Sequence, residues 1–387
     1  MICYYAEQAI VDREAKIIGH EIFYRNSVDR HRYPRGISSV ESTSELVLDR
    51  FLSLDNQLRN DKSELIFINF SYESLLAKLP ILFDKSKLVI EILEDCKPNK
   101  KLLSLVEMYH SEGYKIALDD FTYTDDWEQF LTYVDFVKLD IRNNTIQDLI
   151  DTIENIKVKQ KKQSLKFIAE KIETKEELDF CLSMDFSFFQ GHFFDQGTLY
   201  SSNCLDISGL TITLSKNLLD SIYESYYKNA LSIASIFPNL ESLFYEDIII
   251  VYGLMKVATS IDENFVNKDV NSTLIFLGME RIKVFLELLK NRKNIVCESE
   301  CSIVYRRMCA IVKVILGKST DTINIKQSYV FMACVVRTIG FYKKLHEIGL
   351  LLRVDERLIK SILFRDDPLG LLLDISDGFL DSKSFKK

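Results

Sequence analysis

Two adjacent carboxylates, Asp119 and Asp120, follow a short apolar run at residues 116–118 that has the composition of a buried strand. Neighbouring carboxylates repel each other unless protons, cations or metal ions compensate their charge. The pair is therefore typical either of a metal or catalytic site, or of a turn that leads into a helix capped by Thr124 or Asp125. This stretch alone does not decide between the two interpretations.

Other polar residues occupy the same kind of position, at or near the end of a strand-like apolar run. They are Glu21, Asn69, Glu91, Lys138, Glu170, Glu173 and Gln190. Each alone has a structural explanation. Glu91 could face solvent, for example, and Lys138 could pair with Asp140 on the surface. Because the carboxyl ends of strands meet at one face of a β/α barrel, we expect the whole set to lie together there.

Several carboxylates around one barrel mouth would repel strongly without cations. Carboxylate and amide oxygens, without histidine or thiolate ligands, suit magnesium or manganese (Mg²⁺ or Mn²⁺). Two such ions bridged by a shared aspartate would form a clamp for in-line attack of a metal-activated water on a phosphodiester. In that arrangement Lys138 could orient the water or offset phosphate charge, and Glu170 could take the proton as general base.

The elements that must position these residues follow from hydrophobic periodicity. Residues 1–197 alternate short apolar or β-branched runs with amphipathic stretches, the pattern of β/α units. Strands are expected at 3–11, 17–24, 65–71, 87–93, 114–119, 135–141, 166–172 and 186–191. Helices are expected at 40–52, 100–110, 146–160 and 175–184. We therefore predict a modified (β/α)8 barrel of the TIM type, closed rather than open.

The second half of the chain has a different period. Apolar residues recur at helical spacing in stretches at 246–258, 279–290, 303–316, 329–345 and 355–364. The predicted class is thus α/β plus all-α. It has a barrel domain at 1–197, a linker of small and polar residues at 198–209, and a helical bundle at 210–387.

Composition excludes several kinds of protein. The formal net charge of −8 argues against binding a nucleic-acid polymer, which needs a basic footprint. With five histidines in 387 residues, a histidine-based metal site is not expected. No apolar run is long enough to span a bilayer, and the first residues lack the basic region of a secretion signal. The sequence therefore indicates a cytoplasmic protein without membrane insertion.

Short motifs across residues 1–197 resemble, in order and approximate spacing, those of the EAL domain, the cyclic di-GMP phosphodiesterase module. They are EIFYR at 21–25 (for Glu-Ala-Leu-x-Arg), FINFS at 67–71, VIEILE at 89–94, ALDDF at 117–121, VKLD at 137–140, AEKIET at 169–174 and QGHFF at 190–194.

The resemblance carries residue roles onto matching positions. It implies a set of metal ligands, namely Glu21, Asn69, Glu91, Asp119 and Asp120. It implies that Lys138 holds the attacking water and that Glu170 is the general base or a ligand. Arg25 and Gln190 would belong to the substrate-binding residues, with Arg25 on a ligand phosphate, and Glu173 would support the site.

Three features depart from the resembled motifs. The loop after Asp120, TYTDDW at 122–127, contains no glycine, although active members of the family have one there. Ile22 and Phe23 replace the alanine and leucine of the signature. Lys171 replaces the glycine that follows the proposed base, so a cation is expected beside Glu170.

The helical half resembles an HDOD domain, a relative of HD-type phosphohydrolases that has lost the metal ligands. The resemblance rests on the stretch LGMERIKVFLELL at 277–289. His346 is the only histidine after residue 197, so a histidine–aspartate metal centre is not expected there. The order of the two halves resembles the bacterial EAL–HDOD signalling proteins. That implies a protein partner for the helical half and allows a homodimer.

Two functions therefore stay open at this stage. The first is a phosphodiesterase that uses two Mg²⁺ or Mn²⁺ ions to hydrolyse cyclic di-GMP to linear pGpG and so regulates motility and biofilm. The second is a catalytically degenerate EAL domain that acts as a cyclic di-GMP receptor or as a protein-interaction scaffold through the HDOD part. The complete set of polar strand ends favours the first, and the loop without glycine and Lys171 favour the second.

Overall fold

The structure is a computed structural model. It describes residues 2–25, 38–54, 64–159, 164–205, 207, 209–224, 244, 247–292, 327–340, 352–354, 356–364 and 369. The chain divides into two compact units. The barrel unit comprises Ile2–Val47 and Gln57–Ser202, and the helical unit comprises Leu48–Asn56 and Asn203–Lys387 together with Met1.

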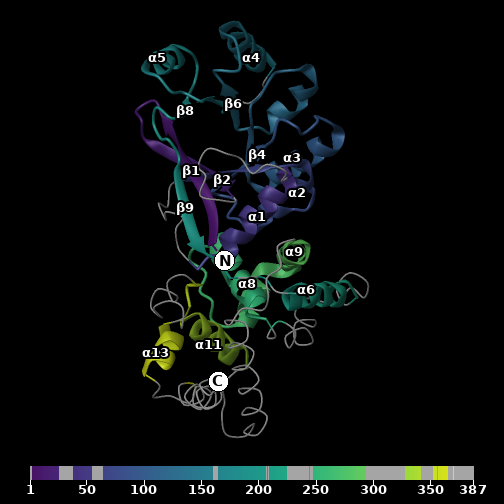
Figure 1. The fold of residues 1–387 in the computed structure, drawn as a ribbon. Coiled ribbons are helices and arrows are strands. Elements are labelled where there is room, and N and C mark those ends of the chain that lie inside the picture. Colours follow the sequence, from purple (N-terminus) through teal and green to yellow (C-terminus); the bar gives the residue numbers. More distant parts are fainter. Residues whose placement is uncertain are drawn as a thin grey trace. The chain divides into compact units, whose positions relative to one another are not determined.

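A nine-stranded sheet forms the centre of the barrel unit (Figure 1). Its strands are β1 (Ile2–Asp12), β2 (Ile17–Arg25), β3 (Leu65–Phe70), β4 (Leu88–Ile92), β5 (Lys115–Leu118), β6 (Phe136–Asp140), β7 (Lys166–Glu170), β8 (Phe188–Gln190) and β9 (Thr198–Asn203). Strands β2 to β8 are parallel, whereas β1 pairs antiparallel with both β2 and β8 and so closes the ring. The predicted closed eight-stranded barrel is thus confirmed, and β9 pairs with β1 outside the ring.

Helical segments connect the strands of the barrel unit. They are α1 (Ser39–Leu52), α2 (Tyr72–Leu76), the 3-10 helix η1 (Leu79–Leu82), α3 (Lys100–Glu112), the 3-10 helix η2 (Asp125–Thr132), α4 (Ile146–Lys159) and α5 (Lys175–Ser183). The four helices expected from the sequence are present, and α2, η1 and η2 are additional. Thr124 is the N-cap residue of η2, so a turn leading into a helix does follow the Asp119–Asp120 pair.

An apolar layer fills the barrel directly below the polar strand ends. It consists of Ile10, Phe67, Val89, Ala117, Phe136 and Ile168, with Phe188 packed against it. Apart from Ile10, each lies two residues before a polar strand-end residue, as Phe136 precedes Lys138. Since side chains in a strand alternate between faces, both members of such a pair point into the barrel. The polar residues therefore lie directly above a layer of buried, closely packed apolar side chains.

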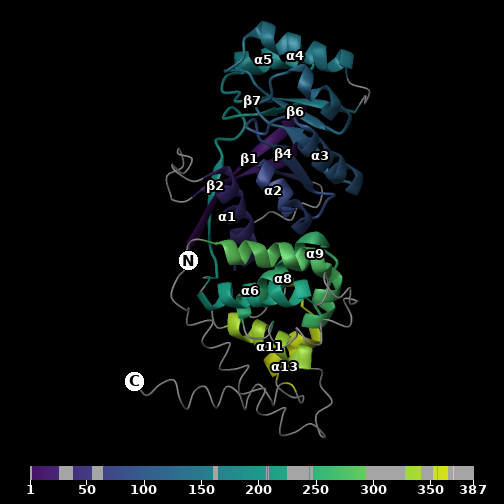
Figure 2. The same ribbon diagram turned by 90° about the vertical axis from the view of Figure 1, so that its right-hand side faces the viewer.

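The described part of the helical unit is built from helices, shown in Figure 2. They are α6 (Gly209–Ile222), α8 (Ile248–Ile261), α9 (Val270–Asn291), α11 (Gln327–Gly340) and α13 (Glu356–Phe364). Helix α9 packs against α6 and α8 and is interrupted at Gly278, whose φ of 71° is not helical. The helix predicted at 303–316 lies outside the described residues.

Two features of the boundary region differ from the sequence-based expectation. Residues 198–203, expected in a linker, form β9, which pairs with β1. Leu48–Asn56, the end of α1 and the residues after it, belongs to the helical unit. Among the described helices, none combines the length and apolarity that crossing a membrane requires.

Candidate active site

The ammonium group of Lys138 is the centre of the polar cluster at the barrel mouth. Its Nζ lies 2.8 Å from Oε2 of Glu21 and 2.8 Å from Oε1 of Glu91. It also lies 2.8 Å from Oε1 of Glu170 and 3.0 Å from Oδ1 of Asp119. The Lys138 side chain is 1% exposed, so four carboxylates converge on one cation that water does not reach.

Two amides complete this cluster. Asn69 donates a hydrogen bond of 2.7 Å from Nδ2 to Oε1 of Glu21. Gln190 donates from Nε2 to Oε2 of Glu21 at 2.9 Å and to Oε1 of Gln8 at 3.0 Å. Among the residues that the structure describes, the buried Oδ1 of Asn69 has no hydrogen-bond partner. This oxygen is therefore available to a ligand.

The register of the strands brings the residues of this cluster to the same level along the barrel axis. Asn69 lies opposite Glu91 on the neighbouring strand, and Gln190 lies opposite Ile10 of β1. Gly191 then turns the chain out of β8 with a φ of 151°. A Cβ atom at that position would sit 2.2 Å from the carbonyl oxygen of Ile172, so only glycine allows this close approach.

The charges in the cluster are not independent. Burial, with the nearby Glu21 charge, raises the pKa of Glu91 well above its usual range despite the opposing effect of Lys138. Burial likewise raises the pKa of Glu170 to about 8 and raises that of Asp119. Burial opposes ionisation of Glu21 as well, but the charge and hydrogen bond of Lys138 outweigh it, and the pKa is lowered. One ammonium therefore does not neutralise all four acids, and the cluster has the capacity to accept further positive charge.

A second ion-pair cluster adjoins the first through the Asp119–Asp120 pair. Nζ of Lys171 lies 3.2 and 3.3 Å from the two carboxylate oxygens of Asp120 and forms an ion pair with Asp140. Asp140 also accepts hydrogen bonds from the backbone of Arg142 and from the backbone and side chain of Asn143. The two adjacent aspartates thus contact two different lysines.

The backbone of this second cluster adopts an unusual conformation. Asp120 has a φ of 41° and Lys171 a φ of 62°, in the left-handed region that side chains other than glycine rarely adopt. A glycine at either position would avoid this cost. The sequence instead places a carboxylate and an ammonium there, and the two form an ion pair.

Arg25 and Glu173, two of the predicted site residues, have other partners. The Arg25 guanidinium lies 5.2 Å from the ring centre of Phe23 and donates to the carbonyl oxygen of Tyr24 at 2.9 Å. Glu173 forms an ion pair of 2.9 Å with Arg142 and is 42% exposed. Both lie outside the group of side chains that contact Lys138.

Two structural explanations considered for single residues are wrong. Glu91 is fully buried and does not face solvent, because both faces of β4 are covered. Lys138 does not pair with Asp140 on the surface, since both side chains are buried and Asp140 pairs with Lys171. Sequence reasoning missed the contribution of Asp140 and of Gln8. The alternation in β6 could have indicated Asp140, which shares a face with Lys138.

The donor set of the first cluster fits a hard divalent cation. Carboxylates and the free amide oxygen of Asn69 are the ligands that Mg²⁺ and Mn²⁺ prefer. Glu21, Glu91 and Asp119 would hold such an ion together with Asn69. Asp120, also predicted as a ligand, fits less well because an ammonium group contacts both of its oxygens.

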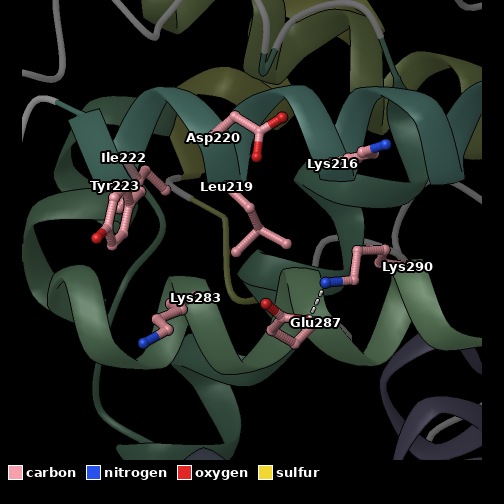
Figure 3. A pocket seen from close by; sticks show the side chains of 8 residues that line it. All are labelled: Lys216, Leu219, Asp220, Ile222, Tyr223, Lys283, Glu287 and Lys290. Carbon is pink, nitrogen blue, oxygen red and sulfur yellow. Dashed lines mark ion pairs between the residues drawn. The ribbon is translucent and has the colours of Figure 1, made fainter.

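The helical unit contains a separate cavity of about 440 Å³ between α6 and α9, seen in Figure 3. Its lining comprises Lys216, Leu219, Asp220, Ile222, Tyr223, Lys283, Glu287 and Lys290. Lys290 and Glu287 form an ion pair of 2.5 Å within it. Most of the lining residues are charged, and Leu219 and Ile222 supply its apolar part.

Residues 6–196 match the sequence model of the EAL domain. The chain is 27% identical over 288 residues to the cyclic di-GMP phosphodiesterase CdgJ of Vibrio cholerae, an alignment that covers 74% of this chain and 63% of CdgJ. It is 25% identical to the Bacillus subtilis protein YuxH, over 75% of this chain and 68% of YuxH. The chain thus spans less than two thirds of CdgJ, and the alignment with CdgJ continues beyond residues 6–196.

Among solved structures, the Bacillus subtilis YkuI protein has an EAL domain and was crystallised in complex with substrate c-di-GMP and calcium. It superposes with a TM-score of 0.41 at 21% identity, over 75% of this chain and 72% of YkuI. The match of the family model coincides with the barrel unit that carries the lysine-centred carboxylates. Residues 6–196 of this chain are therefore similar to an EAL domain.

Proposed function

We propose that this protein is a metal-dependent phosphodiesterase that hydrolyses cyclic di-GMP to linear pGpG. The observation that carries the proposal is the convergence of Glu21, Glu91, Asp119 and Glu170 on Lys138 inside a domain that is similar to an EAL domain. The similar protein CdgJ is a cyclic di-GMP phosphodiesterase, which supports this proposal.

Residue roles follow from the contacts. Glu21, Asn69, Glu91 and Asp119 would hold Mg²⁺ or Mn²⁺, whereas Asp120, predicted from the sequence as a further ligand, is paired with Lys171. Bound divalent ions would polarise a phosphate oxygen and lower the pKa of an attacking water. Once an ion binds these acids and draws them away from Lys138, its ammonium group would be able to donate a hydrogen bond to that water and so orient it. Glu170, whose pKa is raised to about 8, would accept the proton of the water.

Substrate contacts and supporting contacts lie around this centre. Gln190 holds Glu21 in place by its hydrogen bond and would also contact the substrate. Arg25 would contact a phosphate of the substrate from the end of β2. Glu173 would support the site indirectly, because it pairs with the same Arg142 whose Nε donates to the carbonyl oxygen of Lys171.

The direct test follows the conversion of cyclic di-GMP by chromatography, with the purified chain and either Mn²⁺ or Mg²⁺. We expect linear product that requires the metal and that is lost in Glu21→Ala. A matched control is Glu128→Ala, which removes a half-exposed carboxylate that pairs with Lys159. Absence of product from the wild-type chain with both metals would contradict the proposal.

One observation favours a second candidate function. Because Lys171 contacts both oxygens of Asp120, the ligand set for two ions is compromised, and the domain would then bind cyclic di-GMP as a receptor without hydrolysing it. Tight binding in a calorimetric titration, with no product over hours, would favour this receptor function. Neither binding nor product would point to a scaffold.

For the helical unit we propose an HDOD-type module that binds a protein partner and regulates the barrel. The cavity between α6 and α9 supports a binding role. In a cytoplasmic setting, hydrolysis of cyclic di-GMP would favour motility over biofilm.

If the unit regulates the barrel, Leu219→Arg in this cavity should change the rate of product formation. An unchanged rate and affinity would count against regulation through this surface. A homodimer stays a prediction that sedimentation can test.

A further inference from the structure

The barrel mouth contains two lysine-centred clusters of acids that adjoin each other. Lys138 contacts Asp119, and Lys171 contacts Asp120, the next residue. The two lysines differ in accessibility, since the Lys138 side chain is 1% exposed and the Lys171 side chain 46%. Lys138 is therefore fixed in the barrel interior, whereas Lys171 reaches the mouth from the rim.

Lys171 is held in place from both sides. Asp140, 2% exposed, anchors its ammonium group, and Asp140 is itself fixed by hydrogen bonds from Arg142 and Asn143. The same ammonium contacts both carboxylate oxygens of Asp120. A second metal ion at Asp120 would be repelled by this ammonium group, because both oxygens of Asp120 already accept hydrogen bonds from it.

We propose that the ammonium group of Lys171 takes the position of the second metal ion, so that this EAL-like domain binds one divalent cation where its paired aspartates would otherwise bind two. A lysine ammonium is a compact cation that carries half the charge of a divalent ion and needs no ligand beyond its hydrogen-bond acceptors. The inference rests on the proposed metal-dependent function of the same site.

The ion pair between Lys171 and Asp120 links two positions with an unfavourable backbone conformation. Lys171 and Asp120 both have positive φ, which is unfavourable for residues with a Cβ atom. The ion pair joins these two positions across 51 residues of sequence and therefore holds both left-handed turns in one arrangement. Removal of the charge should loosen this arrangement and free the Asp120 carboxylate for a metal ion.

The test counts bound ions directly. The full chain is stripped of metal with a chelator, and Mn²⁺ binding up to millimolar concentration is measured by calorimetry and by equilibrium dialysis. We expect one bound ion in the wild type and in Lys171→Arg, which keeps the charge. We expect two ions in Lys171→Met, which removes the charge, and in Lys171→Gly, which also relieves the left-handed backbone.

Two further variants test whether the second ion binds at Asp120. Asp120→Asn alone should leave one ion, because Asp120 contributes no ligand while Lys171 is present. Asp120→Asn combined with Lys171→Gly should return the count from two to one. Lys157→Met, which removes an exposed lysine paired with Asp185, is the matched control and should bind one ion. Thermal unfolding confirms that each variant is folded.

The outcomes separate this inference from the proposed function, since linear product is measured on the same samples. Two ions in the wild type, or one ion in both Lys171→Met and Lys171→Gly, would overturn the inference even if product forms. One ion in the wild type and two in those variants would support it, and if no product formed in any sample, the phosphodiesterase proposal alone would fall. If no ion bound to the wild type or to any variant, both this inference and the proposed metal-dependent function would be overturned.

Discussion

Nζ of Lys138 lies 2.8 Å from Oε1 of Glu91, a carboxylate with no solvent exposure. Removal of the ammonium in Lys138→Met would leave buried acids without their cation. We expect a loss of about 3–5 kcal/mol in the free energy of unfolding without metal, the usual consequence of breaking a buried ion pair. Because a divalent ion can compensate the same acids, Mn²⁺ should raise the unfolding temperature more in the variant than in the wild type. Equal shifts in calorimetric scans would contradict metal binding at these acids.

The free Oδ1 of Asn69 leads to a prediction about affinity. Asn69→Ala removes this oxygen and the hydrogen bond that orients Glu21. We expect Mn²⁺ binding to weaken about 10-fold or more, in the range found when groups around a metal site are lost. The measurement is a calorimetric titration at constant pH.

Asn99→Ala is the matched control for that titration. Asn99 is the N-cap of α3, and its side chain accepts hydrogen bonds from the helix backbone at Lys101 and Leu102. This variant should lose about 1 kcal/mol of stability with unchanged Mn²⁺ affinity. A similar loss of affinity in both variants would show that Asn69 acts through stability alone.

Asp140 allows a prediction about pH. Burial opposes its ionisation, but the hydrogen bond from Lys171 and those from the backbone of Arg142 and Asn143 outweigh burial and hold its pKa below the usual value. A carboxylate with a lowered pKa in the folded state stabilises the protein fully above its unfolded pKa of about 4, and the contribution disappears as the pH falls below it. Asp140→Asn should therefore cost about 1–3 kcal/mol at pH 7. The difference from wild type should shrink towards pH 3, as measured by urea unfolding, and a constant difference across this range would contradict the assignment.

Thr174 provides a prediction in which the stability of the protein changes but its activity does not. Its side chain accepts a hydrogen bond from the Glu177 backbone, and the Glu177 side chain in turn accepts from the Thr174 backbone, which makes a capping box at the start of α5. Thr174→Ala should cost about 1 kcal/mol. Because Thr174 contacts none of the acids around Lys138, the rate of formation of linear product per folded molecule should stay unchanged. A large loss of this rate would show that α5 contributes to the active site.

Alternation within strands made much of this site predictable from sequence. Phe136 and Lys138 are two residues apart, so both had to point the same way once the strand was recognised, and the same holds for Ile168 and Glu170. The eight ring strands were recognisable because their apolar runs are bounded by turns and helices. Strand β9 was not recognised, because half of its residues are exposed and its sequence has no apolar run; it pairs with β1, where Tyr200 stacks on Tyr5.

The partners of Lys171 were beyond sequence reasoning. The sequence indicates a cation beside Glu170, but the direction in which the Lys171 side chain points depends on the left-handed backbone at Lys171 and at Asp120. Asp120 and Lys171 are 51 residues apart, and the ion pair between them depends on the tertiary structure. The burial of Asp140 also depends on the tertiary structure.

The antiparallel closure by β1 has a consequence for how the protein is made. Glu21 receives its hydrogen bond from Gln190 across 169 residues, and β1 cannot complete the ring until β8 exists. A ribosome must therefore have synthesised almost the entire barrel before the acids at its mouth acquire their final neighbours. Contacts of such long range slow folding and leave strand edges exposed in the nascent chain. The ring that surrounds these acids is thus closed by a pairing between its first strand in the sequence and its last.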